Sequence, residues 1–322
     1  MLARHAPGAE SGGGVQGDAI KILEAARICP PGCPQRAEIT PANLIRVMPA
    51  KGVNLTPRCL TIATSDSGGG AGIQADLKAF AAAGCHGMSA LVALTAQNTV
   101  GVTAIHELPP EFVTAQLEAV FDDIGVDAAK TGMLFSARLI ETVADFLEQQ
   151  PVPLVVDPVM VASSGAQLLE DDAVETLVER LFPLATVVTP NLSEAEVLVG
   201  KQQSKAELAE RIHALGAEAV IVTGGHGEPV DHLFDGREHV EIPIERSNAG
   251  STHGAGCTHS ATLCAGLARG LSLHEAAEKA ARVASDAVAR GLAERGDGDG
   301  PVDVINLKEA SEHHRDHAFG RR

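Results

Sequence analysis

The segment Ser251–Thr258 holds the residue types best suited to chemistry in this sequence. Small residues at 254–256 lead into a helix that we predict over 257–270, so backbone N–H groups can converge on an anion at the positive end of the helix dipole. Cys257 lies at that end, where we expect the pKa of a thiol to fall. An anion pocket beside a proton acceptor suits phosphoryl transfer to an alcohol. The structural alternative is a helix start with a buried small side chain.

A second glycine-rich loop, Asp66–Asp76, follows a predicted strand and opens a helix. It is not a Walker loop, because Gly-Lys-Ser/Thr is absent, and Ile73 occupies the last glycine position of the Gly-x-Gly-x-x-Gly spacing. Its glycines let the backbone approach a ligand closely. Asp76 lies on the helix that follows, where its carboxylate can grip an amine or a pyrimidine edge. The alternative for Asp76 is a solvated helix aspartate.

Polar residues also mark the ends of later predicted elements. Asp157 ends a predicted strand, and ligands collect at the carboxyl ends of parallel strands, which favours a metal- or phosphate-facing role. Asn191 and Glu194 have the spacing of a helix capping box, and a first-turn carboxylate can also face a site. Lys130 is the best candidate for a fixed positive charge near phosphates, with a surface lysine as the alternative.

Composition limits the partners of the 322-residue chain. Its formal net charge is −17, with 25 basic and 42 acidic residues, which argues against a nucleic-acid partner. The sequence has no apolar run long enough to cross a bilayer and no signal-peptide pattern, so we expect a cytoplasmic protein without a membrane partner. The six cysteines form no disulfide framework, which suits a reducing compartment. Tyrosine and tryptophan are absent, so a bound aromatic ring must rest on Met, Val, Phe or peptide planes.

From residue 58 onward, short β-rich runs alternate with helical-period segments, which is typical of a parallel sheet with helices on both faces. The predicted strands are 59–64, 88–94, 154–157, 186–189 and 219–223, with a hairpin at 232–244. The predicted helices are 73–83, 110–123, 136–148, 171–181, 205–215, 257–270 and 273–293, the last opened by a capping box of Ser272 and Glu275. We predict a flexible extension at 1–57, one folded domain at 58–308 and a charged tail at 309–322.

Short motifs spread along the chain give it a specific resemblance. In order they are Asp66–Asp76, Ala96–Thr99, Lys130–Met133, Asp157–Met160, Thr189–Glu194, Gly224–His226 and His253–Thr258. Together they resemble the hydroxymethylpyrimidine/phosphomethylpyrimidine kinases of thiamine biosynthesis, within the ribokinase-like superfamily, over about residues 58–307. The resemblance implies a three-layer α/β/α ribokinase-like fold with a mainly parallel central sheet, with ATP and Mg²⁺ as cofactors and a small-molecule pyrimidine as substrate. It leaves a homodimer open.

The resemblance also implies roles for individual residues. Gln97 occupies the pyrimidine-binding glutamine, whose amide offers a donor and an acceptor to a ring nitrogen and its exocyclic amine. The same substrate pocket is implied to include Asp76, Gly70, Met133 and Val159. The nucleotide side is implied to include Lys130, Asn191, Thr223, Gly225 and His226, and Asp157 and Glu194 are implied to position magnesium. Cys257 takes the place of the catalytic base, after the anion hole of Gly254, Ala255 and Gly256.

Departures from the family pattern are few. Ser67-Gly68 stands where many relatives have Pro-Ser, and Thr223 stands where many have a lysine able to contact ATP phosphates. The implied activity is ATP-dependent phosphorylation of 4-amino-5-hydroxymethyl-2-methylpyrimidine and of its monophosphate.

Three alternatives remain. A pyridoxal or pyridoxine kinase would share the fold, and a non-catalytic pyrimidine-binding regulator would be expected to lose the base or the anion hole. A cysteine hydrolase pairing Cys257 with His253 lacks a visible third member.

Overall fold

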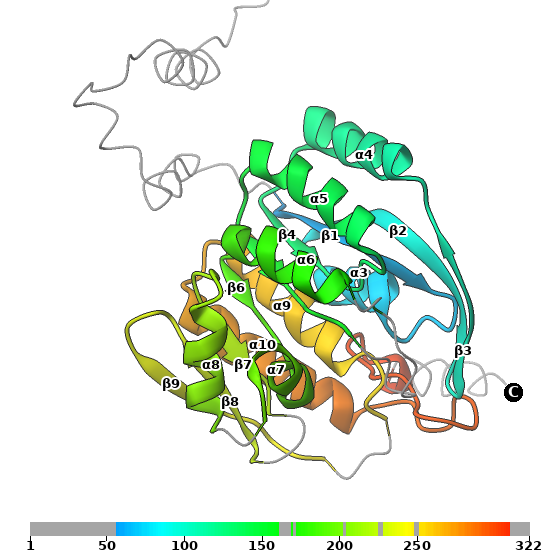
Figure 1. Ribbon diagram of the computed structural model, residues 1–322. Coiled ribbons are helices and arrows are strands. Elements are labelled where there is room, and N and C mark those ends of the chain that lie inside the picture. The colour runs from blue at the N-terminus through cyan, green and yellow to red at the C-terminus, as the bar shows by residue number, and fades with distance from the viewer. Residues whose placement is uncertain are drawn as a thin grey trace, which may run out of the picture. The chain divides into compact units, whose positions relative to one another are not determined.

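The computed structural model describes residues 56–160, 169, 172–201, 204–224, 228–247 and 251–309. One nine-stranded sheet runs through this part of the chain, in the order β3-β2-β1-β4-β5-β6-β7-β8-β9 (Figure 1). Its strands are β1 (Arg58–Asp66), β2 (His86–Asn98), β3 (Gly101–Glu107), β4 (Ala128–Thr131), β5 (Leu154–Val156), β6 (Val187–Val188), β7 (Val220–Val222), β8 (Val230–Phe234) and β9 (His239–Pro243). The six central strands pair in parallel, in the order β2-β1-β4-β5-β6-β7. Strand β3 at one edge and β8 and β9 at the other pair antiparallel, so the sheet is mainly parallel as predicted.

Helices cover both faces of the sheet (Figure 1). They are α3 (Gly72–Ala82), α4 (Pro110–Ala119), α5 (Ala137–Gln149), α6 (Ala173–Arg180), α7 (Leu192–Val199), α8 (Lys205–His213), α9 (Ala255–Ala268) and α10 (Leu273–Ala289), with short turns η2 (Val120–Ile124) and η3 (Phe182–Leu184). One hydrophobic layer joins α4, α5, α6 and α8 to Leu60 of β1, and the other joins α3, α9 and α10 to Cys59. Adjacent residues of a strand point to opposite faces, so β1 supplies both layers of a three-layer α/β/α architecture.

Helix α9 is sequestered because its residues are small. Nearly every residue from Thr258 to Ala268 is buried, and a side chain at Gly266 would collide with Ala276 of α10. Close packing of α10 on one side and the sheet on the other therefore fixes the axis of α9. The N-terminus of this helix then has a fixed position relative to the ends of the strands.

Most predicted elements are confirmed, and their ends differ by a few residues. Helix α9 begins at Ala255 rather than at 257, α10 ends at Ala289 rather than at 293, and α4 ends at Ala119 where the π-helical turn η2 takes over. The capping boxes at Ser272 and Asn191 are confirmed. Strands β3 and β4 are not among the predicted ones. The predictions for residues 1–55 and 310–322 lie outside the described residues.

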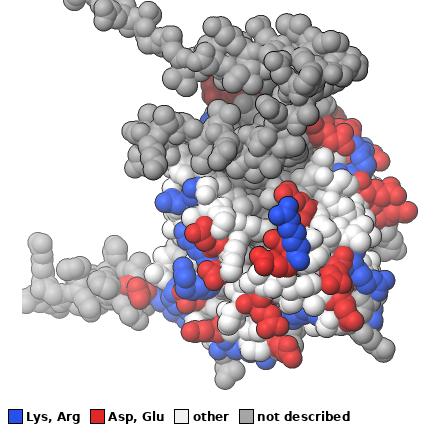
Figure 2. Space-filling view, turned by 90° about the vertical axis from the view of Figure 1, so that its left-hand side faces the viewer, with Lys and Arg blue, Asp and Glu red and all other residues white. Residues whose placement is uncertain are grey.

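Surface properties follow the composition. On the described part of the face in Figure 2, acidic and basic side chains are interspersed, so charge of either sign is spread over that face. Within the ranges that the structure describes, no helix has both the length and the apolar character needed to span a bilayer.

Candidate active site

A pocket opens at the edge of the sheet where the parallel strands end, which is where open α/β sheets bind ligands. The N-terminus of α9 faces the same pocket. Its wall brings together these predicted site residues: Gln97, Lys130, Met133, Asp157, Val159, Asn191, Glu194, Thr223, Gly254, Ala255, Gly256 and Cys257. Residues as far apart in the sequence as Gln97 and Cys257 therefore share one cavity, because each lies at or just after the carboxyl end of a strand or at the start of a helix.

Asp76 does not lie on the pocket wall, which corrects the prediction of a direct substrate contact. Its side chain is fully buried on α3, accepts a hydrogen bond of 2.6 Å from Thr61 Oγ1 and lies 2.8 Å from Lys130 Nζ. Burial raises the pKa of the Asp76 carboxyl, while Lys130 and Thr61 act against that rise. Asp76 therefore supports Lys130 from behind.

Gly70 is likewise absent from the pocket wall. It allows the backbone of its loop to pack closely against His253. Its N–H donates to Asp66 Oδ2 at 3.0 Å. A Cβ on Gly70 would collide with the ring of His253, and a Cβ on Gly254 would collide with the carbonyl oxygen of Gly70. The two glycines allow the loop after β1 and the loop before α9 to touch. The predicted residues Gly225 and His226 lie outside the described residues.

Lys130 is the fixed positive charge of the pocket. It is the next-to-last residue of β4, its side chain is fully buried, and its Nζ lies 3.5 Å from Asp157 Oδ2 as well as against Asp76. Burial acts to lower the pKa of this ammonium, but the charges of Asp76 and Asp157, and that of Cys257 when it is ionised, raise it well above its ordinary value. Lys130 is therefore held cationic at physiological pH, which contradicts the surface-lysine alternative.

The start of α9 has the geometry expected of an anion site. Gly254 is its N-cap with φ of 85°, a left-handed conformation that favours glycine, and no side chain among the described residues caps this helix. The first-turn N–H groups of a helix lack intrahelical partners. Those of Gly256 and Cys257 are therefore available to an anion in the pocket.

Cys257 corrects one expectation from the sequence. Its pKa is raised to about 12, first by burial and then by the charges of Asp76 and Asp157, while Lys130 and the Gly72 N–H act to lower it. Burial and the neighbouring carboxylates thus outweigh Lys130 and the Gly72 N–H. At neutral pH the thiol is mostly protonated, and only a minor thiolate population can accept a proton.

Carboxylates gather beside Lys130. Glu194 forms the capping box with Asn191, its Oε2 accepting from Asn191 N at 2.9 Å and its N–H donating to Asn191 Oδ1 at 3.0 Å. Asp157 accepts from Ser260 Oγ of α9 at 2.8 Å. Burial first, and then the charge of Asp157, raise the pKa of Glu194 to about 8. Both carboxylates are buried on the pocket wall, and the charge of Asp157 disfavours ionisation of Glu194.

This donor set fits a magnesium ion. Mg²⁺ is usually bound by one or two carboxylates together with substrate phosphates and waters. Among the described residues there is no cluster of three or more His, Cys, Asp or Glu able to hold a metal by themselves. A divalent cation beside Asp157 and Glu194 would offset the repulsion that raises the pKa of Glu194.

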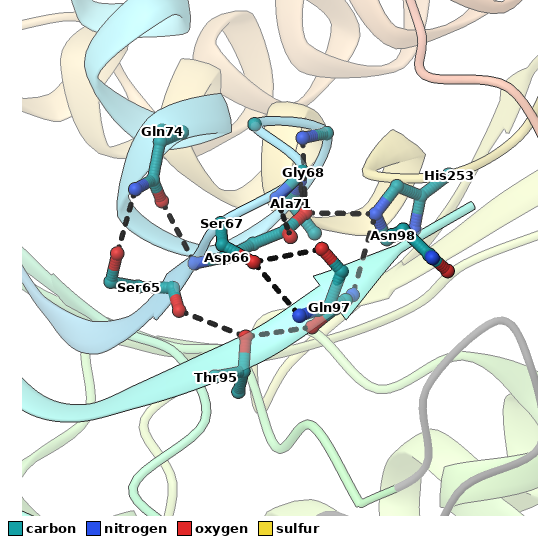
Figure 3. A network of polar contacts seen from close by, with 12 residues as sticks. Ser65, Asp66, Ser67, Gly68, Ala71, Gln74, Thr95, Gln97, Asn98 and His253 are labelled. Carbon is teal, nitrogen blue, oxygen red and sulfur yellow. Dashed lines mark hydrogen bonds and ion pairs between the residues drawn. The ribbon is translucent and has the colours of Figure 1, made fainter. Parts of the chain in front are cut away.

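A hydrogen-bond network surrounds Gln97 at the other end of the pocket (Figure 3). Gln97 lies at a register shift of the β2–β3 ladder, and such irregularities re-aim side chains. Asp66 collects the N–H groups of Gly68, Gly70 and Ala71 at 2.7, 3.0 and 2.8 Å, and its Oδ2 lies 2.9 Å from Nε2 of His253.

Sequence reasoning did not assign Asp66 and His253 to the site, although both line the pocket. One signal was available for Asp66, since an aspartate before consecutive small residues often binds the backbone N–H groups that follow. No local signal links it to His253.

Thr223 replaces a lysine that many relatives carry, and it lies on the pocket wall. It forms a parallel bridge with Asn191, and its N–H donates to Pro190 O at 2.9 Å. This backbone pairing places a hydroxyl beside the capping box of Glu194. Lys130 is therefore the cation on this part of the described wall.

The site can be set against known proteins. The family model described as phosphomethylpyrimidine kinase matches residues 66–303. The chain belongs to this family. It is 48% identical over 257 residues to a hydroxymethylpyrimidine/phosphomethylpyrimidine kinase from Rhizobium meliloti, which covers 77% of this chain and 97% of that protein.

A longer relative and a solved structure extend the comparison. The chain is 51% identical over 258 residues, 78% of its length, to the thiamine biosynthesis bifunctional protein ThiED of Geobacter sulfurreducens, and it spans only 52% of that relative. An ADP complex of Bacillus subtilis pyridoxal kinase has a TM-score of 0.72 and 38% identity, covering 79% of this chain and 99% of the other. The predicted ribokinase-like fold is confirmed by this likeness and by the sheet order.

Proposed function

We propose that this phosphomethylpyrimidine kinase family member transfers the γ-phosphoryl group of ATP to the hydroxymethyl oxygen of 4-amino-5-hydroxymethyl-2-methylpyrimidine, and then phosphorylates the monophosphate. The observation that supports this best is the convergence of Gln97, Lys130 and Cys257 with the start of α9 on one pocket wall. The name of the Rhizobium meliloti relative, similar over nearly its whole length, points to the same pair of reactions.

In the proposed first reaction, the alcohol oxygen attacks the γ-phosphorus. A new O–P bond forms, the bond from the γ-phosphorus to the bridging oxygen of ADP breaks, and ADP leaves. The alcohol proton goes to the thiolate of Cys257. The N–H groups of Gly256 and Cys257 and the ammonium of Lys130 stabilise the charge on the transferring group, which is the main demand of phosphoryl transfer.

The metal and the substrate ring have separate holders. Asp157 and Glu194 would hold Mg²⁺, which when bound neutralises charge on the phosphates. Gln97 binds the pyrimidine edge, and Met133 and Val159 line the same pocket, where a thioether and a branched apolar side chain can contact a ring face. The chain has no tyrosine or tryptophan to do so.

The second candidate is pyridoxal phosphorylation. It is favoured by the likeness to the B. subtilis pyridoxal kinase structure. Both substrates are aromatic N-heterocycles with a hydroxymethyl arm, and the exocyclic amine of the pyrimidine distinguishes them. Gln97 offers an acceptor for that amine and a donor for the adjacent ring nitrogen, which is why we place the pyrimidine first.

An ADP-release assay with the pyrimidine alcohol, its monophosphate and pyridoxal tests the proposal. We expect kcat/KM for the pyrimidine alcohol to exceed that for pyridoxal by at least about tenfold, the value of roughly one good hydrogen bond. A higher kcat/KM for pyridoxal would overturn the substrate assignment. Pyrimidine binding without ADP release would instead support the regulator alternative.

A further inference from the structure

His253 lies between two polar groups from distant elements (Figure 3). Its Nε2 is 2.9 Å from Oδ2 of Asp66, at the end of β1, and 3.5 Å from Nε2 of Gln97, near the end of β2. All three side chains line the pocket. The contact therefore connects the glycine-rich loop, the residue expected to read the pyrimidine, and the loop that precedes α9.

The ring of His253 has little freedom. It packs against Gly70, where a Cβ would collide with it, and it is 8% exposed. Its backbone is held on both sides, since His253 N–H donates to Gly300 O at 3.3 Å and Val302 N–H donates to His253 O at 3.1 Å. The position of Nε2 is consequently set by packing before any substrate binds.

The carboxylate of Asp66 decides which nitrogen of His253 carries the proton. Burial acts to raise the pKa of Asp66, but hydrogen bonds from His253 and from the N–H groups of Ala71 and Gly68 lower it below its ordinary value. An ionised carboxylate can only accept hydrogen bonds. At 2.9 Å from it, Nε2 of His253 must be the donor, because the other tautomer would set two lone pairs against each other.

That donor in turn fixes the amide of Gln97. The two ends of a glutamine amide are assigned from their partners. The one proton on Nε2 of His253 is donated to Asp66 at 2.9 Å, so the amide of Gln97, at 3.5 Å, is a second and weaker acceptor of the same N–H. The amide oxygen belongs on that side, because the NH₂ end would set two donors against each other. The other end meets Thr95 Oγ1 at 3.1 Å, and Thr95 Oγ1 also lies 3.0 Å from Ser65 O. Thr95 has one proton, which goes to Ser65 O, so its lone pair accepts from the amide nitrogen of Gln97.

We infer that His253, held by Asp66, is a positioning residue that sets the amide of Gln97 with its oxygen toward His253 and its nitrogen toward Thr95. The inference rests on the proposed function. The remaining lone pair of the amide oxygen then faces an exocyclic amine, and the remaining N–H faces a ring nitrogen acceptor. A heterocycle with this donor–acceptor order is matched, and one with the order reversed is not.

Two variants of His253 separate positioning from structural support. In His253→Asn the amide nitrogen stands where Nδ1 was, so no donor reaches Gln97. In His253→Gln an amide N–H can occupy the place of Nε2. We expect KM for the pyrimidine alcohol to rise about tenfold in His253→Asn, the loss of one positioned hydrogen bond, with KM for ATP changing less than about twofold.

Recovery distinguishes the role. In His253→Gln the KM for the pyrimidine alcohol should return most of the way to the wild-type value. The control is His86→Asn, a change at an exposed histidine at the opposite end of β2, and its KM should match that of the wild-type protein. Thermal unfolding of each variant identifies any general loss of fold. If His253→Gln is as impaired as His253→Asn while both remain folded, the donor at Nε2 is not what matters and the inference fails.

A double-mutant cycle with Gln97→Leu tests the connection itself. If His253 acts through Gln97, His253→Asn adds less than about twofold to the pyrimidine KM once Gln97 has been replaced. Additive effects of the two substitutions would overturn the inference. A decrease confined to kcat would overturn it too, because it would mean that His253 acts on the catalytic step at Cys257 and not on pyrimidine binding. Wild-type protein that phosphorylates no pyrimidine would overturn the proposed function instead, so the two failures are distinguishable.

Discussion

The two ends of the pocket differ in their interactions: ionisable groups dominate one end, and a hydrogen-bond network dominates the other. At the phosphate-facing end, the ionisable groups of Lys130, Asp157 and Glu194 are buried beside the half-buried Cys257. The pKa of Glu194 rises to about 8 and that of Cys257 to about 12. At the heterocycle-facing end, Asp66 receives the hydrogen bonds of three backbone N–H groups as well as that of His253.

The two ends of the pocket are therefore suited to different tasks. The phosphate-facing end holds charges whose protonation depends on what lies beside them, so it suits a reaction in which charge moves. The heterocycle-facing end is a closed sequence of donors and acceptors, so it suits recognition of one ring edge. Changes at the first end should therefore alter kcat or stability, and changes at the second should alter KM.

Cys257→Ala should give the largest loss of activity. Removing a general base lowers kcat by about 10²–10⁴, and KM for the pyrimidine should change far less, because Gln97 lies at the other end of the pocket. Steady-state kinetics with both substrates measures the split. Wild-type turnover in this variant would remove Cys257 from the proposed mechanism.

The pH dependence sharpens the same prediction. With the pKa of Cys257 at about 12, the thiolate fraction grows about tenfold for each pH unit, so log kcat/KM of the wild-type protein should rise through pH 9 without a plateau. In Cys257→Asp a carboxylate of low pKa replaces the thiol, and the rise should disappear while part of the activity remains. If log kcat/KM of the wild-type protein reached a plateau at neutral pH, a Cys257 thiol of raised pKa would not be the general base.

Lys130→Met should give the largest loss of stability. Removing one partner of a buried ion pair leaves an uncompensated charge and costs about 3–5 kcal/mol, here on Asp76, whose side chain is fully buried. Urea unfolding measures the difference, with Lys201→Met at an exposed lysine as the matched control. Adding Asp76→Leu to Lys130→Met should recover part of the loss. An equal cost for the two lysine variants would show that the pair is not stabilising.

Sequence periodicity predicts most of this fold because most of its strands and helices have local patterns. Strand β4 is the instructive exception. Ala128–Thr131 contains no branched apolar run, and the strand exists because β1 and β5 pair with it on both sides. Its residues are all buried, including Lys130, which a local reading takes for a surface residue.

The same division holds at the site. The capping box of Asn191 and Glu194 and the glycine start of α9 are local, and both follow from sequence. The pair of Asp76 and Lys130 joins residues 54 apart, and the contact of Asp66 with His253 joins residues 187 apart. Such contacts depend on the closed fold. The helix-dipole argument failed for the pKa of Cys257 for the same reason, because burial is a tertiary property.

Glu194→Gln should change how stability depends on pH. The folded pKa of Glu194 is about 8 against an ordinary 4.5, so the folded protein keeps a proton that the unfolded chain has lost. This contribution to stability is complete below pH 4.5 and is lost as pH rises to 8, with a slope of up to about 1.4 kcal/mol per pH unit. Unfolding curves from pH 5 to 8.5 should be flatter for Glu194→Gln than for the wild-type protein.

Magnesium provides the control for that measurement. A cation that binds the ionised pair of Asp157 and Glu194 competes with the proton, so MgCl₂ should raise the melting temperature more at pH 8 than at pH 6. The difference should vanish in Glu194→Gln. An equal rise at both pH values would mean that the ion binds elsewhere.

Gln97→Leu should have the smallest effect of these changes, and it completes the comparison. Loss of the two hydrogen bonds proposed to the pyrimidine should raise its KM about 10- to 100-fold, while kcat and KM for ATP change little. Gln97 contacts no ionisable group of the phosphate-facing end among its described hydrogen bonds, so its replacement leaves the charges there as they are. A matching rise in KM for ATP would show that the heterocycle-facing end also affects nucleotide binding. The two ends of the pocket would then not act independently.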